Sequence, residues 1–320
     1  MNATETLEDF SLDDLYNELR YRANKVTSDK KGIINRKSRI NTIPTLTIVT
    51  AVKSRQKVIY GTDDRKDFHN IQNRLDILND IQSTVALFES DKVRDLGDGT
   101  SEITVEKFGD VYNLCSNEKF REQPIGAFCS GFLVAPDIIA TAGHCVNMND
   151  VQNVRFVFGF RMNGPDNPNT KISNSDVYKG ESLIDRKLTD DGTDWALVKL
   201  DRPVQNHTSV KIRKQGKIAD NQKVHVIGHP CGLPLKVAEN AFVRDNSNSS
   251  YMTCNLDTYG GNSGSPVFNS ETHEVEGILV RGETDFEPSG NCNVSLVCPT
   301  TGCRGEDVTR TTEFAHLIDT

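Results

Sequence analysis

The chain has 320 residues, of which 36% are hydrophobic and 26% charged, and its formal net charge is −8. This composition is typical of a folded globular protein and allows one to three domains. The acidic balance argues against nucleic acid or an anionic membrane surface as a partner. No stretch of the sequence approaches the roughly 18 uninterrupted apolar residues that predict a membrane-spanning helix.

The N-terminal segment differs from the rest of the chain. Residues 1–57 contain no cysteine and many charged side chains. Leu12, Leu15 and Leu19 recur at helical spacing, which predicts an amphipathic helix over 11–24. We expect residues 1–57 to be either a pro-segment or a permanent extension. The start, MNATETLEDFSLDD, lacks the basic region and apolar run of a signal peptide.

From about residue 80 onward, short segments rich in Val, Ile and Phe alternate with turns that contain Gly, Pro, Asn or Asp. Many short strands without intervening helices predict an all-β sandwich or barrel. The final segment, TTEFAHLIDT, predicts a short C-terminal helix. The expected strands are 83–88, 130–135, 138–144, 154–160, 195–200, 223–229, 265–268 and 275–282.

Eight cysteines lie in the last two thirds of the chain. An even number without a CxxC pair is typical of disulfides in an oxidising compartment, while reduced structural thiols in a cytosolic enzyme are the alternative. Metal binding by the last three is disfavoured, because no histidine lies nearby and the spacings match no common zinc pattern. We expect neither a metal nor a cofactor. The cysteines are Cys115, Cys129, Cys145, Cys231, Cys254, Cys292, Cys298 and Cys303.

Ser263 lies in the segment YGGNSGSP, at 259–266. Serine is a weak nucleophile, so catalysis needs a neighbouring base and two backbone N–H groups aimed at one oxyanion. Glycines on both sides allow the sharp turn that presents such groups. We expect Ser263 to be a nucleophile, with an oxyanion hole formed by the N–H groups of Gly261 and Ser263. A Gly/Ser-rich surface loop is the alternative. Cys231 and Cys254 both precede this segment, and we expect a disulfide between them.

His144 lies in the segment TAGHC, at 141–145, directly after the apolar run IIATA. A single histidine is usually structural, and we expect that role for the other six. His144 differs because a predicted strand leads to it and Cys145 follows it. A disulfide between Cys129 and Cys145 would hold the imidazole in place. General-base catalysis requires such fixed geometry before it requires a tuned pKa.

Asp194 directly precedes the apolar strand WALVKL, at 195–200. A carboxylate that accepts the second imidazole N–H would set the tautomer of His144 and stabilise its protonated form. Asp190 and Asp191 are rival candidates, but they lie in the polar turn LTDDGT. Asp194 adjoins the buried strand and is therefore the preferred partner.

The motifs TAGHC, DWALVKL and GNSGSP, in this order, resemble those of the trypsin-like (chymotrypsin-fold) serine peptidase superfamily. The segment CNLDTYGGNSGSPVF is most similar to the bacterial secreted glutamyl endopeptidase branch, and the resemblance covers about 58–320. It implies an all-β fold of two six-stranded antiparallel barrels. His144 and Asp194 would come from the first barrel and Ser263 from the second, with the cleft between them.

The resemblance also implies a domain organisation and a function. The chain would contain an N-terminal segment (1–57), a first barrel with its N-terminal extension (58–205), and a second barrel with a C-terminal helix (206–320). The protein would be a secreted or periplasmic serine endopeptidase that cleaves protein or peptide substrates through an acyl-enzyme. We expect a monomer that binds neither nucleic acid nor membrane.

Substrate preference stays open between basic and acidic residues. Asp257, six residues before the nucleophile, stands where trypsin-type enzymes bind Lys or Arg. Thr258 matches a threonine that contacts substrate in the glutamyl branch. The segment GILVRG resembles the strand that lines the pocket, with Leu279 where that branch has a histidine. Arg281 would pair with Asp257 or with an acidic substrate, and Gly282 completes the expected lining. A purely structural Asp257 is the third possibility.

The segment VIYGTDDRKD, at 58–67, is similar to the start of the mature chain in such enzymes. A basic site ends at Lys57, so cleavage there would free Val58 and make the protein a zymogen. Asn262 replaces the aspartate that pairs with the new α-amino group in trypsin-like zymogens. The resemblance to the glutamyl branch implies that the freed terminus would lie near the specificity pocket instead and help to bind an acidic side chain.

Two alternatives to a general endopeptidase remain on the same fold. One is a non-catalytic binding protein, since a scaffold can lose activity and keep a binding role. The other is a protease with a single protein target, similar to the exfoliative toxins. An α/β-hydrolase is disfavoured: GNSGS matches the pattern GxSxG, but in that fold the serine precedes the histidine and lies between a strand and a helix.

Overall fold

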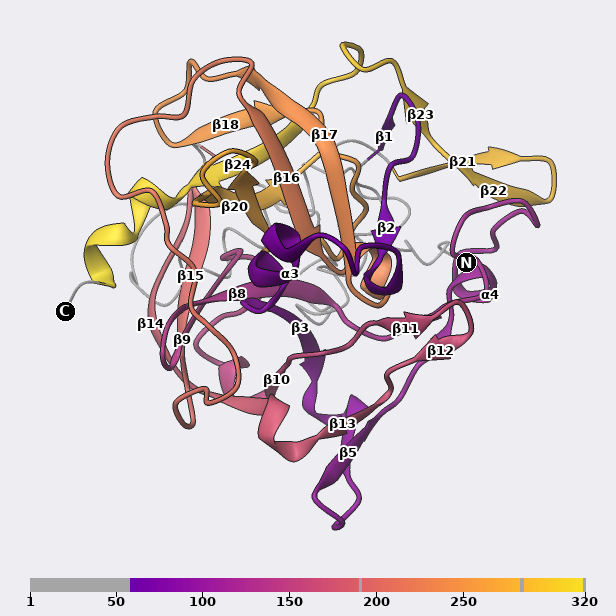
Figure 1. Ribbon diagram of the computed structural model, residues 1–320, viewed down its shortest axis with the longest axis vertical. Helices are drawn as coiled ribbons and strands as arrows, with labels where there is room; N and C mark the ends of the chain where they lie inside the picture. Colours follow the sequence, from indigo (N-terminus) through magenta and orange to yellow (C-terminus); the bar gives the residue numbers. More distant parts are fainter. Residues whose placement is uncertain (1–57, 190–191, 283–284, 319–320) are drawn as a thin grey trace, which may run out of the picture.

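The computed structural model describes residues 58–189, 192–282 and 285–318. Its architecture is two closed six-stranded antiparallel β-barrels, which confirms the all-β, chymotrypsin-like fold expected from the sequence. The barrels lie one above the other in Figure 1, the first in purple and pink and the second in orange and yellow. The helix expected over 11–24 and the rival residues Asp190 and Asp191 lie outside the described residues.

The first barrel has the strand order β10-β14-β15-β9-β8-β3, and β10 pairs with β3 to close it. All of its strand pairs are antiparallel. Its strands are β3 (Thr84–Glu89), β8 (Cys129–Ala135), β9 (Ile138–Thr141), β10 (Val154–Val157), β14 (Val177–Leu188) and β15 (Asp194–Leu200).

The second barrel has the order β16-β19-β20-β24-β18-β17, and β16 pairs with β17 to close it. Strand β2 (Lys66–Asp67) extends β17 at its edge, so the chain that precedes the first barrel is joined to the second. The barrel strands are β16 (Lys223–Gly228), β17 (Lys236–Asp245), β18 (Tyr251–Cys254), β19 (Pro266–Asn269), β20 (Val275–Arg281) and β24 (Glu306–Arg310).

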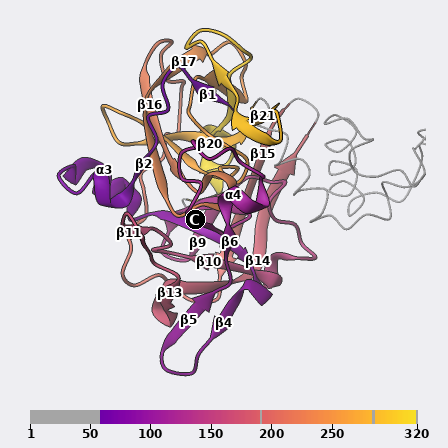
Figure 2. The ribbon, with the colours of Figure 1, turned by 90° about the vertical axis from the view of Figure 1, so that its right-hand side faces the viewer.

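Smaller elements decorate the barrels. Helix α3 (Leu75–Ile81) stands out from one side of the molecule in Figure 2. The others are α4 (Phe108–Val111) and strands β1 (Ile59–Tyr60), β4 (Val93–Asp95), β5 (Thr100–Ile103), β6 (Glu106–Lys107), β7 (Pro124–Ile125), β11 (Met162–Gly164), β12 (Asn167–Pro168), β13 (Lys171–Ser173), β21 (Phe286–Ser289), β22 (Cys292–Ser295) and β23 (Val297–Cys298).

The C-terminal helix takes the form of two consecutive 3-10 turns, Thr311–Glu313 and Ala315–Leu317. Phe314 lies between them, is fully buried, and its ring packs 5.6 Å from that of Trp195. This contact anchors the end of the described chain to β15 of the first barrel.

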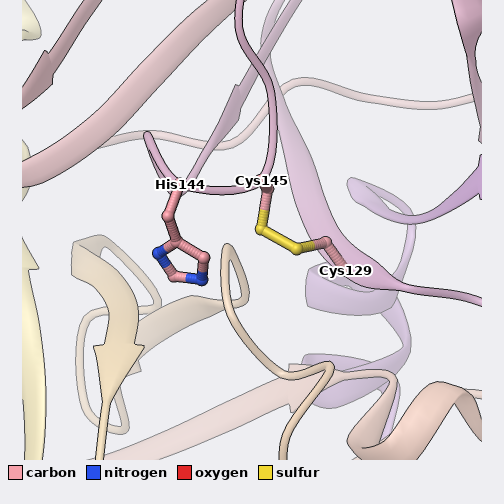
Figure 3. Close-up of side chains that lie close together, drawn as sticks. All are labelled: Cys129, His144 and Cys145. Atoms are coloured by element: carbon pink, nitrogen blue, oxygen red, sulfur yellow. A yellow bond between two sulfur atoms is a disulfide. The ribbon is translucent and has the colours of Figure 1, made fainter. Parts of the chain in front are cut away.

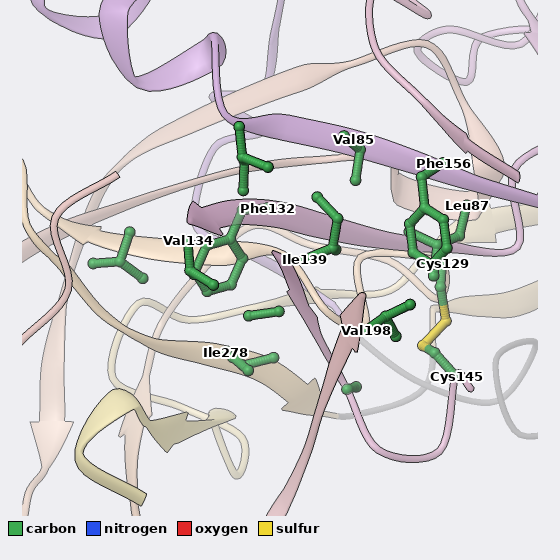
Figure 4. Packing of buried hydrophobic residues seen from close by; sticks show 14 of the residues in the cluster. Val85, Leu87, Cys129, Phe132, Val134, Ile139, Cys145, Phe156, Val198 and Ile278 are labelled. Carbon is green, nitrogen blue, oxygen red and sulfur yellow. A yellow bond between two sulfur atoms is a disulfide. The ribbon is translucent and has the colours of Figure 1, made fainter. Parts of the chain in front are cut away.

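The core of the first barrel is built from apolar side chains that alternate along its strands. Val85, Leu87, Phe132, Ile139 and Phe156 are all fully buried and share one cluster (Figure 4). Burial of such a side chain contributes roughly 1.5–3 kcal/mol relative to leaving it exposed. The barrel is therefore a rigid support for the loops that leave its strands.

Three disulfides are present, which fits the interpretation of the cysteines as oxidised. They join Cys115 to Cys292, Cys129 to Cys145, and Cys298 to Cys303. The expected Cys231–Cys254 bond is wrong: Cys254 packs in the core of the second barrel, whereas Cys231 packs in a different cluster, against Tyr259. No helix in the described part of the chain is long and apolar enough to cross a membrane.

Candidate active site

His144 follows the end of β9 in a turn that a disulfide anchors. The imidazole and the Cys129–Cys145 bridge leave neighbouring positions of this turn, as Figure 3 shows. Gly143 is needed beside it, because a Cβ there would lie 2.7 Å from the carbonyl oxygen of Lys187. The local sequence AGHC thus lets the histidine approach the neighbouring strands closely.

Asp194 begins β15 and holds the imidazole. The Nδ1–H of His144 donates to Oδ2 of Asp194 at 2.7 Å, and the backbone N–H of His144 donates to Oδ1 at 3.1 Å. Both side chains are fully buried. Burial opposes ionisation of the carboxyl group, but the charge and hydrogen bonds of His144 outweigh it and lower the pKa of Asp194. The carboxylate therefore stays ionised and fixes which imidazole nitrogen faces away from it.

Ser263 lies between the two barrels. Its carbonyl oxygen accepts a 2.9 Å hydrogen bond from the backbone N–H of Ser130, the second residue of β8. Within the described residues, neither Oγ of Ser263 nor Nε2 of His144 has a hydrogen-bond partner, and both atoms are buried. Nucleophile–base hydrogen bonds are often long in an enzyme without substrate and tighten in the complex.

Glycines on both sides of Ser263 permit the turn that the sequence predicted. Gly261 and Gly264 have φ values of +84° and +91°. A Cβ at Gly264 would lie 2.0 Å from the carbonyl oxygen of Ser130, so no larger residue fits there. Among the described residues, the N–H groups of Gly261 and Ser263 donate no hydrogen bond to another group.

Two residues that the sequence analysis missed hold this loop. The Ser130 hydroxyl donates to the carbonyl oxygen of Gly261 at 2.9 Å and accepts from the N–H of His229 at 3.0 Å. Both carboxylate oxygens of the fully buried Asp285 accept from the N–H of Gly260, at 3.1 and 3.2 Å. Ser130 carries a weak signal, because it follows Cys129 at the start of a predicted strand. Asp285 carries none, since it lies outside every motif.

Asp257 occupies a different environment from the one its position suggested. Its carboxylate accepts backbone N–H groups of Tyr60 at 2.7 Å and Asp64 at 3.0 Å, so it holds the segment that follows Val58. Burial raises the pKa of Asp257 to about 7, against the effect of these two donors, and the charge of Asp64 adds to the rise.

The remaining expected pocket residues have defined partners. Arg281 does not pair with Asp257, because its guanidinium donates to Asp307 at 3.1 Å. Leu279 is fully buried in the core of the second barrel and contacts the serine loop through its backbone, at Gly264 and Ser265. The Asp257–Arg281 interaction considered from the sequence is therefore wrong.

Thr258 and Gly282 both lie next to a carboxylate that the sequence analysis did not consider. The Thr258 hydroxyl donates to Oε2 of Glu306 at 3.0 Å. A Cβ at Gly282 would lie 1.9 Å from the same oxygen. Glu306 begins β24, where no strand had been expected, so no motif pointed to it.

A cleft of about 220 Å³ opens beside the serine loop. Its lining includes Gly260, Gly261 and Phe128, the residue before the start of β8.

Comparisons with known proteins agree with this geometry. Residues 129–278 match the family model of a trypsin-like peptidase domain, a range that contains His144, Asp194 and Ser263. Over this range the chain is therefore similar to trypsin-like peptidase domains. A search of curated proteins found no match.

Among solved structures, the chain is similar to one described as "Structure of Vibrio cholerae VesB protease". The two share 14% sequence identity with a TM-score of 0.48, and the alignment covers 82% of this chain and 67% of the other.

Proposed function

We propose that this chain is a serine endopeptidase, with Ser263 as nucleophile, His144 as general base and acid, and Asp194 as the residue that orients the histidine. The observation that carries the proposal is the buried His144–Asp194 pair, which leaves Nε2 of His144 available to accept the proton of Ser263. If His144 and Asp194 were only structural contacts of the barrel, their packing would not require an ionised carboxylate.

The reaction follows from these positions. As Oγ of Ser263 attacks the peptide carbonyl carbon, its proton moves to Nε2 of His144, and Asp194 stabilises the resulting imidazolium. The N–H groups of Gly261 and Ser263 bind the oxyanion. His144 then gives the proton to the leaving amine, and water attacks the acyl-enzyme with the same assistance. His144 takes a proton from this water and returns it to Oγ of Ser263 as the acyl group leaves as a carboxylic acid, which regenerates the serine.

Replacement of the nucleophile tests this proposal. Ser263→Ala should lower the rate of casein cleavage by about 10⁴- to 10⁶-fold while the fold is retained. His144→Ala should cost a similar factor, and Asp194→Asn somewhat less. Near wild-type cleavage by Ser263→Ala would disprove the assignment. Normal folding without cleavage of any peptide library by the wild type would favour the non-catalytic or single-target alternatives.

We further propose that the enzyme prefers a basic residue before the scissile bond, with Glu306 as the selecting group. The support is the position of its carboxylate between Thr258 and Gly282, the two expected pocket residues. A buried carboxylate attracts a cationic side chain and rejects an anionic one. Asp257 is bound to backbone amides instead.

Peptide-library profiling of Glu306→Gln tests the preference, with Asp257→Asn as the matched control. Loss of an ion pair in a buried pocket should lower kcat/KM for Lys and Arg substrates by about 10²-fold, since a charged hydrogen bond contributes roughly 1.5–3 kcal/mol. Asp257→Asn should leave the preference unchanged. A wild-type preference for Glu, or a larger change in Asp257→Asn, would contradict the proposal.

Finally, we propose that the protein is exported and activated by cleavage after Lys57. The three disulfides support export, because such bonds persist in oxidising compartments. Val58 is fully buried and clusters with Tyr60 and Cys298, and the N–H of Tyr60 donates to Asp257. N-terminal sequencing of the active enzyme checks this, and active enzyme that retains residues before Val58 would contradict it.

A further inference from the structure

A second cluster of chemically active side chains lies away from the serine loop. It joins Asp80 in the last turn of α3, His225 in β16, and His273 in the turn between β19 and β20. Nε2 of His225 lies 2.9 Å and Nδ1 of His273 lies 2.6 Å from the same oxygen, Oδ2 of Asp80. All three potential ligand atoms lie within 4.8 Å of one another.

The potential ligand atoms of Asp80, His225 and His273 match those of a transition-metal site. Two imidazole nitrogens and one carboxylate oxygen form a ligand set of the kind that Zn²⁺ takes, with bonds of about 2.0–2.2 Å. Tetrahedral bonds of that length separate neighbouring ligand atoms by about 3.3 Å. The present separations of 2.6 and 2.9 Å therefore need only a small expansion to admit an ion.

Two further contacts orient the His225 ring for metal binding. Its Nδ1 lies 3.1 Å from the Ser270 hydroxyl, and its ring stacks on Phe268 with an interplanar angle of 5°. Metal-binding histidines usually have such a partner on the other ring nitrogen. A hydroxyl both donates and accepts, so Ser270 accommodates either tautomer of His225. The ring can thus donate to Asp80 or present a lone pair to an ion without losing this contact.

His273 provides the entrance to the cluster. Its side chain is 31% exposed, whereas those of His225 and Asp80 are 1% and 7% exposed. Its backbone has a φ of +57°, a left-handed conformation that only a few per cent of non-glycine residues adopt. The turn that holds it is ordered by Asn269, whose side-chain oxygen accepts the N–H groups of Glu271 and Thr272.

We propose that Asp80, His225 and His273 bind a zinc ion, with water completing the coordination. The ion would join α3, which precedes the first barrel, to two elements of the second barrel. Because α3 stands at the edge of the molecule (Figure 2), this bond stabilises the packing of the N-terminal part of the described chain. The site is separate from the proposed catalytic residues, so it does not depend on the proposed peptidase activity.

Isothermal titration of the full chain with ZnCl₂ tests the proposal, in a Ser263→Ala background that prevents self-digestion. We expect one strong site per chain and a rise in Tm with zinc. His273→Gly removes the exposed ligand while glycine keeps the positive φ, and this variant should lose the site and the rise in Tm. Ser270→Ala should weaken binding about 10- to 100-fold.

His207→Ala is the matched control, because His207 also faces a carboxylate, that of Asp176 at 3.3 Å, but lacks a second histidine. It should bind zinc as the parent does. Near-ultraviolet circular dichroism establishes that each variant is folded. Absence of a strong site in the parent chain, or an undiminished site in folded His273→Gly, would overturn the proposal.

Discussion

Removal of the Ser130 hydroxyl should reduce catalysis by disturbing the backbone that precedes the nucleophile. Ser130→Ala leaves the carbonyl oxygen of Gly261 and the N–H of His229 without their side-chain partner, in a fully buried position. The backbone bond from Ser130 to Ser263 remains. Leaving one buried polar group unsatisfied costs about 1–3 kcal/mol, so we expect a comparable or larger loss of unfolding free energy.

The carbonyl oxygen that loses its partner belongs to Gly261, whose own N–H is a proposed oxyanion donor, and this sets the size of the kinetic effect. Complete loss of one such donor costs about 10²- to 10³-fold in kcat. A donor that is less firmly held but still present should cost less, about 10- to 100-fold, with little change in KM. Steady-state kinetics on a peptide substrate measures both parameters.

Ser101→Ala is the matched control for this experiment. Ser101 is also buried, in β5, and its hydroxyl donates to Oδ1 of Asn174 at 2.7 Å, away from the serine loop. It should lower stability without lowering kcat. Equal kcat values for Ser130→Ala and the wild type would refute the reasoning, as would an equal loss in Ser101→Ala.

Two further predictions concern stability. Cys129→Ser with Cys145→Ser opens a loop with a sequence separation of 16, so thermal or urea unfolding should show a loss of about 3 kcal/mol; an unchanged midpoint would contradict this. Burial lowers the pKa of His229 to about 3, so the folded state excludes a proton that the unfolded state binds below about pH 6.5. Stability should therefore be full above that pH and fall by up to about 1.4 kcal/mol per unit below it. His229→Asn, which keeps a donor for Leu233, should fall less steeply in urea titrations at pH 4–7, and an equal slope would argue against this origin.

The sequence predicted the strands in which apolar side chains are buried on both faces of the sheet or at every second residue. Residues 84–88 of β3 and 129–134 of β8 are all buried, and their apolar runs are visible without a structure. Strand β14 was missed because most of its twelve residues are exposed or half-buried and many are charged. Its pairing with β15 is satisfied through the backbone, which the side-chain pattern does not reveal.

The residues of the candidate site likewise differ in how well the sequence predicted them. His144, Asp194 and Ser263 each carry a local signal, because glycines, a cysteine or an apolar strand must adjoin them for steric reasons. Asp257 shows the opposite case: its place before the nucleophile suggested substrate contact, yet its partners are amides of Tyr60 and Asp64, almost 200 residues away in the chain. The position of a residue in the sequence determines where its backbone lies on its own loop. The partner of a buried carboxylate depends instead on which distant segment of the chain packs against it. For this reason Glu306, from a strand that no pattern predicted, becomes the acidic group between Thr258 and Gly282.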